Sequence, residues 1–154
     1  MGPKAEGLSC LCGNKQRVVD RLRYYIIMCG GYYEQFDKPK ALTEVHGEPV
    51  IKRTLRLLER AGIRRQQIYI TVSDHLHMGE FTTLGVAVLL HENTYRYEGG
   101  QMHGYWLDAF YTGLPQDAKV TYLYGDVVYT QEAINTITSC DRHGNILFGT
   151  RILP

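Results

Sequence analysis

A short apolar run at residues 24–29, Tyr-Tyr-Ile-Ile-Met-Cys, constrains the fold more than any other feature of the sequence. The run contains no charged residue and stops at a pair of glycines, Gly30 and Gly31. Continuous apolar runs of this length are typical of strands that are buried on both faces. Such strands occur almost only in parallel sheets with helices packed on them. The run therefore predicts the first strand of an α/β protein.

The rest of the chain alternates between the patterns of helices and those of strands. Residues 50–61 follow Pro49, precede Gly62 and carry apolar residues at helical spacing, which predicts an amphipathic helix. Further strands are expected at residues 67–72, 86–90, 119–124 and 145–149, and further helices at residues 102–112 and 131–139. Parallel strands joined by helices need crossover connections. We therefore expect a Rossmann-like three-layer α/β sandwich with a mostly parallel sheet.

The length and composition fit one globular domain. The chain has 154 residues, of which 44% are apolar and 21% charged, close to globular averages. Residues 1–22 hold several glycines and show no sustained periodicity, so we expect a loose N-terminal extension before an α/β domain at residues 23–154. No apolar run approaches the roughly 18 residues of a membrane span. Four unevenly spaced cysteines favour a reducing compartment, and we expect a cytoplasmic protein.

The charges are divided unevenly along the chain, although the formal net charge is only +1. Residues 1–66 hold 13 of the 17 Lys and Arg residues, whereas residues 67–154 hold 9 of the 16 Asp and Glu residues. The near-zero net charge gives no support for nucleic acid or a membrane as partner. The division suits a site where a basic half binds an anion and an acidic half binds a cation. Chance, with one solvated basic helix, is the simpler explanation of the charges alone.

One candidate binding segment follows the first predicted strand. Open parallel sheets bind ligands beyond the carboxyl ends of their strands. Residues 30–40 begin with the two glycines, whose backbone can approach a ligand closely. The same segment contains Lys38 and Lys40, which can hold phosphate oxygens. The segment predicts a phosphate-rich anion as ligand, although a structural tight turn explains the glycines about as well.

A second candidate is the turn of Gly125 and Asp126, directly after the predicted strand at residues 119–124. An aspartate at the carboxyl edge of a sheet can hold Mg²⁺ that bridges phosphate groups. An aspartate that only completes a turn fits the spacing equally well. The basic segment and this acid lie in the two halves that the charge distribution separates.

Two longer stretches resemble a known family. Residues 26–31 and the string Pro-Lys-x-Leu-x-x-Val-x-Gly-x-Pro at residues 39–49 are similar to the start of the nucleotidyltransferase-like family with the GT-A fold. Residues 124–128, Tyr-Gly-Asp-Val-Val, resemble the metal-binding strand end of that family. Gly104, with the helix expected after it, resembles the segment that cups the nucleotide base. The resemblance spans about residues 24–150 and implies a fold of the nucleotide-diphospho-sugar transferase type.

The resemblance implies a role for each matching residue. Gly30 and Gly31 would lie along the nucleotide, with Lys38 and Gly104 as further nucleotide-binding residues. Lys40 would contact the triphosphate and Asp126 would bind Mg²⁺, and these two would be the catalytic residues. The implied reaction is the attack of a substrate phosphate on the α-phosphorus of a nucleoside triphosphate (NTP), with release of pyrophosphate. The expected partners are an NTP and a small phosphorylated acceptor such as a sugar phosphate.

The sequence departs from the family in two places. Its first loop, residues 30–36, does not contain the usual Gly-x-Gly-x-Arg, and Lys38 offers a point charge in place of a bidentate guanidinium. Family members also continue well beyond the Gly-Asp strand, so we expect residues 23–154 to be an incomplete domain. Two alternatives therefore stand beside the enzyme: a non-catalytic nucleotide-binding remnant or fragment without the acceptor-binding half, and a subunit of an oligomer that obtains the missing part from another chain.

Overall fold

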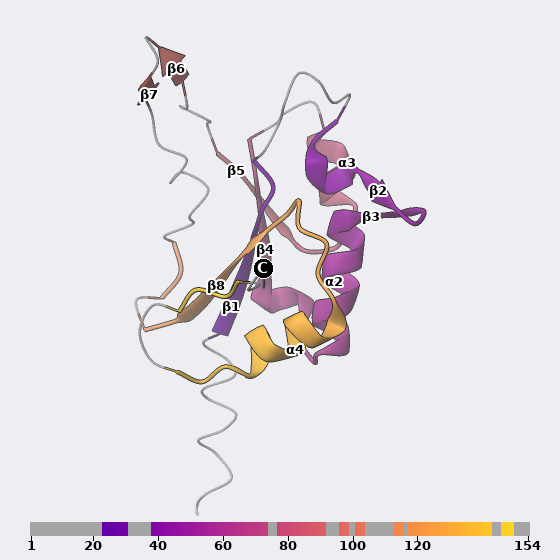
Figure 1. Cartoon of the computed structure of the whole chain (residues 1–154), viewed down its shortest axis with the longest axis vertical. Helices are drawn as coiled ribbons and strands as arrows, with labels where there is room; N and C mark the ends of the chain where they lie inside the picture. The colour runs from indigo at the N-terminus through magenta and orange to yellow at the C-terminus, as the bar shows by residue number, and fades with distance from the viewer. Residues whose placement is uncertain are drawn as a thin grey trace, which may run out of the picture.

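The computed structural model describes residues 23–30, 38–73, 77–91, 96–98, 101–103, 113–115, 117–142 and 146–149. The centre of this part is a four-stranded sheet with the order β5-β4-β1-β8, in which all neighbouring strands are parallel. The strands are β1 (Arg23–Met28), β4 (Ile68–Val72), β5 (Ala87–Leu90) and β8 (Lys119–Tyr124), as Figure 1 shows. Four of the predicted strands are thus confirmed to within one residue at each end.

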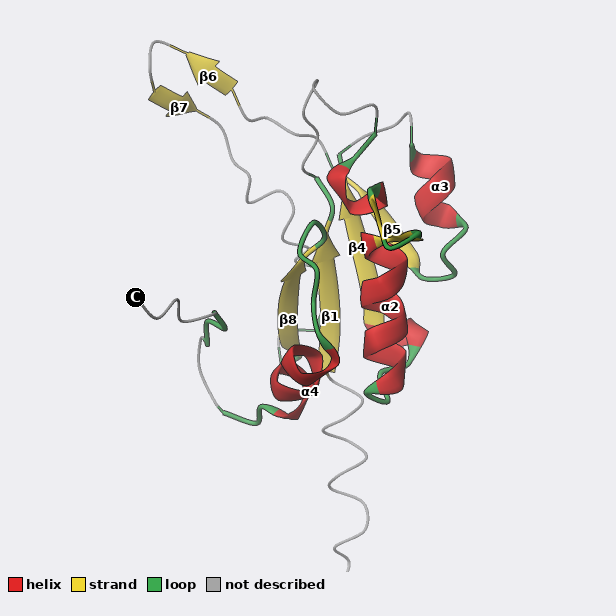
Figure 2. Ribbon diagram, turned by 45° about the vertical axis from the view of Figure 1, so that its right-hand side comes forward, coloured by secondary structure: helices red, strands yellow, loops and turns green. Residues whose placement is uncertain are grey.

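Three helices of the described residues pack on one face of the sheet. They are α2 (Val50–Arg60), α3 (Met78–Thr82) and α4 (Gln131–Ser139), and Figures 1 and 2 show them on the same side of the strands. Alternate residues of the strands meet the apolar stripe of α2 in this layer. The core includes Tyr25, Ile27, Ile51, Leu55, Leu58, Ile68, Ile70, Val72, Phe81, Leu123, Ile134 and Ile137. This arrangement confirms the predicted helices at residues 50–61 and 131–139 and the mostly parallel α/β Rossmann-like fold.

A short segment leads from the edge of the sheet into α2. It consists of the 3₁₀ turn η1 (Lys40–Leu42) and the antiparallel pair β2 (Glu44–Val45) and β3 (Glu48–Pro49). The two residues between these strands, His46 and Gly47, both have positive φ, at 54° and 76°. Two-residue hairpin turns favour this backbone because its twist matches that of the strands. The turn brings Pro49 to the N-cap position of α2.

The predicted helix at residues 102–112 is wrong at its start. Gln101–His103 form the strand β7, which pairs with β6 (Arg96–Glu98) in an antiparallel hairpin, and residues 104–112 lie outside the described residues. The sequence between the two strands is Gly-Gly, a composition that favours hairpin turns. Cross-strand pairing therefore outweighs the apolar spacing that suggested a helix.

The predicted fifth strand is not present in residues 146–149, which have no regular secondary structure. Leu147 has 96% of its surface exposed. An apolar run becomes a strand only where a neighbouring strand takes up its backbone hydrogen bonds. The remaining residue of that prediction, Asn145, and the expected extension at residues 1–22 lie outside the described residues. Within the described residues, no helix has the length and apolar character needed to span a membrane.

The ends of β1 and β8 approach each other closely at Gly125. The backbone N–H of Gly125 donates a hydrogen bond to the carbonyl oxygen of Met28 at 2.9 Å. A Cβ added to Gly125 would lie 2.5 Å from Sγ of Cys29 and 2.8 Å from that carbonyl oxygen. Both separations are shorter than nonbonded contacts allow, so this position needs glycine for space.

We predict that Gly125→Ala destabilises the protein by about 1–3 kcal/mol, because the new methyl group overpacks the contact with Cys29 and Met28. The measurement is the free energy of unfolding from urea denaturation. Gly79→Ala is the matched control, since Gly79 lies exposed in α3 and a Cβ there meets nothing within 4 Å. That control should be unchanged or up to about 1 kcal/mol more stable. Equal effects of the two substitutions would contradict the close approach.

Candidate functional site

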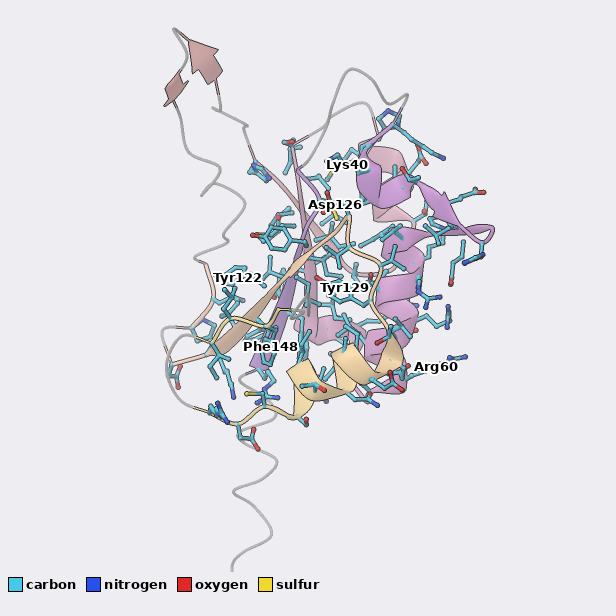
Figure 3. The ribbon with its side chains drawn as sticks, viewed as in Figure 1. Lys40, Arg60, Tyr122, Asp126, Tyr129 and Phe148 are labelled. Carbon is cyan, nitrogen blue, oxygen red and sulfur yellow. The ribbon has the colours of Figure 1, made fainter. Side chains whose placement is uncertain are left out.

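Two charged side chains meet at the carboxyl edge of the sheet. Nζ of Lys40 lies 3.5 Å from Oδ2 of Asp126, although the residues are 86 positions apart in the sequence. Figure 3 shows the two side chains next to each other. The side chains are 31% and 40% exposed, respectively. Each is therefore accessible to a ligand, and together they present one charge of each sign at a single point.

Buried neighbours fix the backbone at Lys40. Lys40 is the first residue of η1, and the two residues that follow it, Ala41 and Leu42, are buried in the core. The turn is closed by backbone hydrogen bonds from Leu42 N–H to the carbonyl oxygen of Pro39 at 2.9 Å and from Thr43 N–H to that of Lys40 at 3.0 Å. The apolar pair thus holds the turn against α2, while the lysine side chain reaches the sheet edge.

Gly30 lies at the same edge, two residues beyond Met28, the last residue of β1. Its carbonyl oxygen accepts a hydrogen bond from Oγ of Ser73 at 3.0 Å. A Cβ added to Gly30 would lie 3.2 Å from both Cε1 and Nε2 of His91. Glycine at this position therefore leaves room for the imidazole, and both neighbours belong to the candidate site.

Ser73 and His91 were not among the residues that the sequence singled out. A signal was available, because Ser73 directly follows β4 and His91 directly follows β5. The rule that places ligands beyond the carboxyl ends of parallel strands applies to every strand of the sheet. These two residues complete the set that follows the four strands.

The thiol of Cys29 lies beneath this edge and remains neutral. Burial raises the pKa of Cys29 well above its usual range, and the negative charge of Asp126 raises it further. A thiolate, not a thiol, is the nucleophilic form of cysteine. The site therefore offers charge and hydrogen bonds to a ligand, and not a cysteine nucleophile.

Asp126 fits a Mg²⁺ ligand of the kind that shares the ion with a phosphorylated substrate. Mg²⁺ keeps several waters in such sites and is held by one or two carboxylates plus phosphate oxygens. Within the described residues, no group of three or more His, Cys, Asp and Glu side chains converges as a metal cage. A site in which the protein and the substrate phosphates both bind Mg²⁺ needs only one or two carboxylates from the protein. The partly exposed carboxylate of Asp126 meets this need.

The other predicted site residues fall in two groups. Lys38 lies two residues before Lys40, in the segment that enters η1. Gly31 and Gly104 lie outside the described residues. The structure thus brings Lys40, Asp126 and Gly30 to one edge of the sheet.

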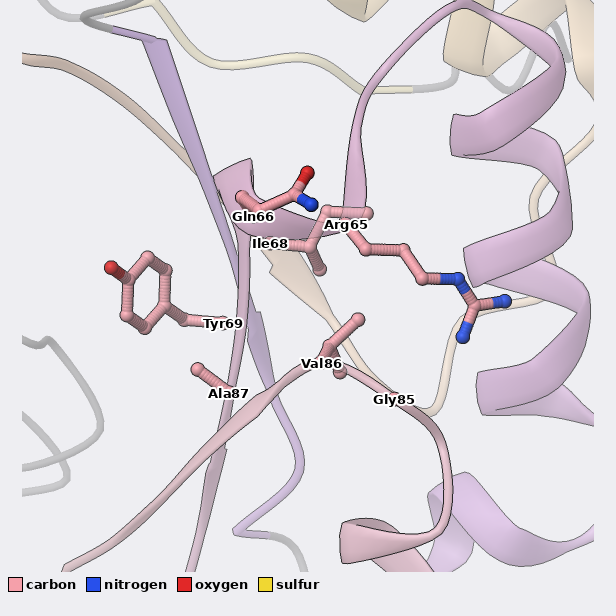
Figure 4. A pocket seen from close by; sticks show the side chains of 7 residues that line it. All are labelled: Arg65, Gln66, Ile68, Tyr69, Gly85, Val86 and Ala87. Carbon is pink, nitrogen blue, oxygen red and sulfur yellow. The ribbon is translucent and has the colours of Figure 1, made fainter.

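A cavity of about 400 Å³ lies elsewhere, at the amino ends of β4 and β5. Figure 4 shows the side chains around it, and its lining consists of Arg65, Gln66, Ile68, Tyr69, Gly85, Val86 and Ala87. Because all four strands are parallel, this cavity and the Lys40–Asp126 pair lie at opposite ends of the sheet. The cavity is therefore not part of the candidate site.

Comparison with solved structures supports the fold. The crystal structure of Rv0371c from Mycobacterium tuberculosis H37Rv is similar, with a TM-score of 0.55 and 16% sequence identity. The similarity covers 76% of this chain and 59% of that chain. At this identity, the likeness shows a shared fold, and the chain spans 59% of the neighbour's length. No curated protein matches the chain.

Comparison with protein families gives a more specific result. Residues 25–149 match the family described as the MobA-like NTP transferase domain. The matched range contains β1, η1, α2 and β8, and with them both Lys40 and Asp126. It also covers well over half of the 154 residues. The chain therefore belongs to the family of MobA-like NTP transferase domains.

Proposed function

We propose that this domain is a nucleotidyltransferase that transfers a nucleoside monophosphate from an NTP to a sugar phosphate or a similar small phosphate in the cytoplasm, with Mg²⁺ bound at Asp126. The observation that carries the proposal is the Lys40–Asp126 pair, 3.5 Å apart at the carboxyl edge of a parallel sheet. The family match adds the class of donor, because its description names NTP transfer.

The chemistry needs little from the protein beyond position and charge. In nucleotidyl transfer, an acceptor phosphate oxygen attacks the α-phosphorus in line, and pyrophosphate leaves. Both reactants are anions, so a binding site lowers the barrier by aligning them and by offsetting their negative charge. Lys40 would hold oxygens of the triphosphate with its ammonium group. Mg²⁺ at Asp126 would supply further charge neutralisation on the phosphates.

Lys40 and Asp126 act as temporary partners in this proposal. An ion pair between partly exposed side chains contributes only about 0–1 kcal/mol, so it is readily exchanged. A divalent cation held by Asp126 would compete with the ammonium group of Lys40 for the carboxylate and would repel that group. Phosphate oxygens at the same edge would then attract the ammonium group. Each binding event would therefore favour the other.

The second candidate is a nucleotide-binding module without turnover. The sequence of residues 30–36 favours it, because this loop does not contain the arginine of the usual Gly-x-Gly-x-Arg. An arginine offers bidentate contacts to phosphate that lysine cannot provide. Binding of an NTP without release of pyrophosphate in the presence of phosphorylated acceptors would favour this candidate.

The primary experiment is calorimetric titration of the chain with ATP, GTP, CTP and UTP, each with and without Mg²⁺. We expect one of the four to bind, and to bind tightly only with the metal. That result would identify the donor for a screen of phosphorylated acceptors by pyrophosphate release. If none of the four binds in either condition, the proposed function is wrong.

We predict that Asp126→Asn removes the metal-dependent gain in NTP affinity. The amide has no negative charge, and loss of a direct ligand should cost at least about 10-fold in metal affinity, the lower end for ligand-supporting residues. Calorimetry with Mg²⁺ measures the change. Asp117→Asn is the matched control, since Asp117 precedes β8 at the opposite end of the same strand. If Asp126→Asn retains the full Mg²⁺ dependence, Asp126 is not the metal ligand.

We predict that Lys40→Ala has effects of opposite sign on two ligands. Triphosphate binding should weaken by about 10-fold or more, because a charged hydrogen bond is lost, and monophosphate binding should weaken less. Binding of Mn²⁺ alone should become up to about 5-fold tighter, because the competing ammonium group is gone.

The matched control for this prediction is Lys52→Ala, on the exposed surface of α2. This variant removes an exposed ammonium group of α2 and keeps the one that pairs with Asp126, so it should change neither affinity. Equal losses of affinity for monophosphate and triphosphate in Lys40→Ala would contradict a contact with the outer phosphates.

A further inference from the structure

A hydrogen bond to Tyr129 joins the two ends of the loop that carries Asp126, residues 124–129. The phenol oxygen of Tyr129 accepts a hydrogen bond from the backbone N–H of Tyr124 at 3.0 Å. Tyr124 is the last residue of β8, and Tyr129 directly precedes the N-cap residue of α4. The hydrogen bond therefore closes a ring of backbone and side chain that contains Gly125 and Asp126. Figure 3 shows Tyr129 beside the loop, between Asp126 and the helices.

Other contacts fix both ends of this loop to the fold. The backbone carbonyl of Tyr129 accepts a hydrogen bond from Nε of Arg53 on α2 at 3.3 Å, and the Tyr129 side chain packs against the hydrophobic core. The next residue, Thr130, caps α4 by accepting a hydrogen bond from the N–H of Ala133 at 3.2 Å. At the other end, the N–H of Gly125 donates to the sheet. The loop is thus held by the sheet and by two helices.

The phenol of Tyr129 remains neutral beside the carboxylate. Burial raises the pKa of Tyr129 above its ordinary value, and the charge of Asp126 raises it further, while the hydrogen bond from Tyr124 has the opposite effect. A neutral phenol accepts the N–H hydrogen bond without adding negative charge at a site for phosphates.

We propose that Tyr129 is a positioning residue, which sets the place of the Asp126 carboxylate by holding the strand end at Tyr124. The inference rests on the proposed function, because it takes Asp126 as the ligand of a divalent cation. A loop without such a tie samples many conformations, and a ligand that selects one of them loses affinity. With the tie, the carboxylate is presented at the sheet edge before the ligand arrives.

The test is a titration of the whole chain with Mn²⁺ alone. Binding is measured by the paramagnetic broadening of the backbone amide NMR signals of Gly125 and Asp126. Tyr129→Phe keeps the ring in place and removes only the acceptor oxygen. We expect this variant to bind Mn²⁺ about 5-fold more weakly, as the loss of one net hydrogen bond implies. The amide proton of Tyr124 should also exchange faster with solvent, which a role in core packing alone would not cause.

Tyr124→Phe is the matched control. It removes a hydroxyl group from the residue that donates the hydrogen bond through its backbone, and the Tyr124 side chain is exposed. This variant should bind Mn²⁺ as the wild type does. Arg53→Met tests the same loop from α2: it removes the donor to the Tyr129 carbonyl and should also weaken Mn²⁺ binding, even if Tyr129→Phe does not fold.

Two outcomes would overturn the inference, and they differ in what they say of the proposed function. Wild-type affinity in Tyr129→Phe and Arg53→Met, together with loss of Mn²⁺ binding in Asp126→Asn, would remove the positioning role and keep Asp126 as the metal ligand. Unchanged Mn²⁺ binding in Asp126→Asn, or no broadening at Gly125 and Asp126 in the wild type, would overturn the metal assignment and this inference with it.

Discussion

The parallel pairing of β1 with β8 is the constraint on which the candidate site depends. The strands pair over six residues, from Arg23 with Lys119 to Met28 with Tyr124, so they end side by side. The segments that follow them, remote from each other in the sequence, therefore leave the sheet at one edge. A slip of one residue would move Asp126 by about 3.3 Å along the strand and would turn the alternating side chains to the opposite face. The close contact of Gly125 with Met28 and Cys29 fixes this register at the carboxyl ends of the two strands, next to Asp126.

Much of the fold follows from the sequence, because its patterns reflect burial against one layer of helices. In β1 and β4, alternate residues contribute to the core, and α2 contributes residues from each of its turns. From β8, Leu123 is the residue that joins this core. Two predictions failed, the start of the helix at residues 102–112 and the strand at residues 145–149. In both short segments, the secondary structure depends on pairing with another strand and not on burial. Residues 101–103 form a strand because residues 96–98 pair with them, whereas residues 146–149 form no strand although they are the more apolar segment. Backbone partners of this kind leave no periodic trace in a single sequence.

The site divides in the same way between what is predictable and what is not. Lys40 and Asp126 were predictable, because a parallel sheet brings the segments after its strands together. Ser73 and His91 obey the same rule and were missed because a single serine or histidine after a strand carries no pattern of its own. Tyr129 is a different case, since its role depends on a side chain that returns to the backbone five residues earlier. No spacing in the sequence distinguishes that bond from an ordinary tyrosine packed on the core.

The site combines a fixed backbone with two charged groups on partly exposed side chains. Lys40 is held from behind by the buried pair Ala41 and Leu42, and Asp126 by the contacts of Gly125 and Tyr129. Neither the buried pair nor the contacts of Gly125 and Tyr129 involve the ion pair that the two side chains form. A ligand that breaks the ion pair therefore leaves the supports intact, and only the two charged ends have to move. Such a division would suit the proposed nucleotidyl transfer, in which the site has to release a product and return to the same geometry before it binds another NTP.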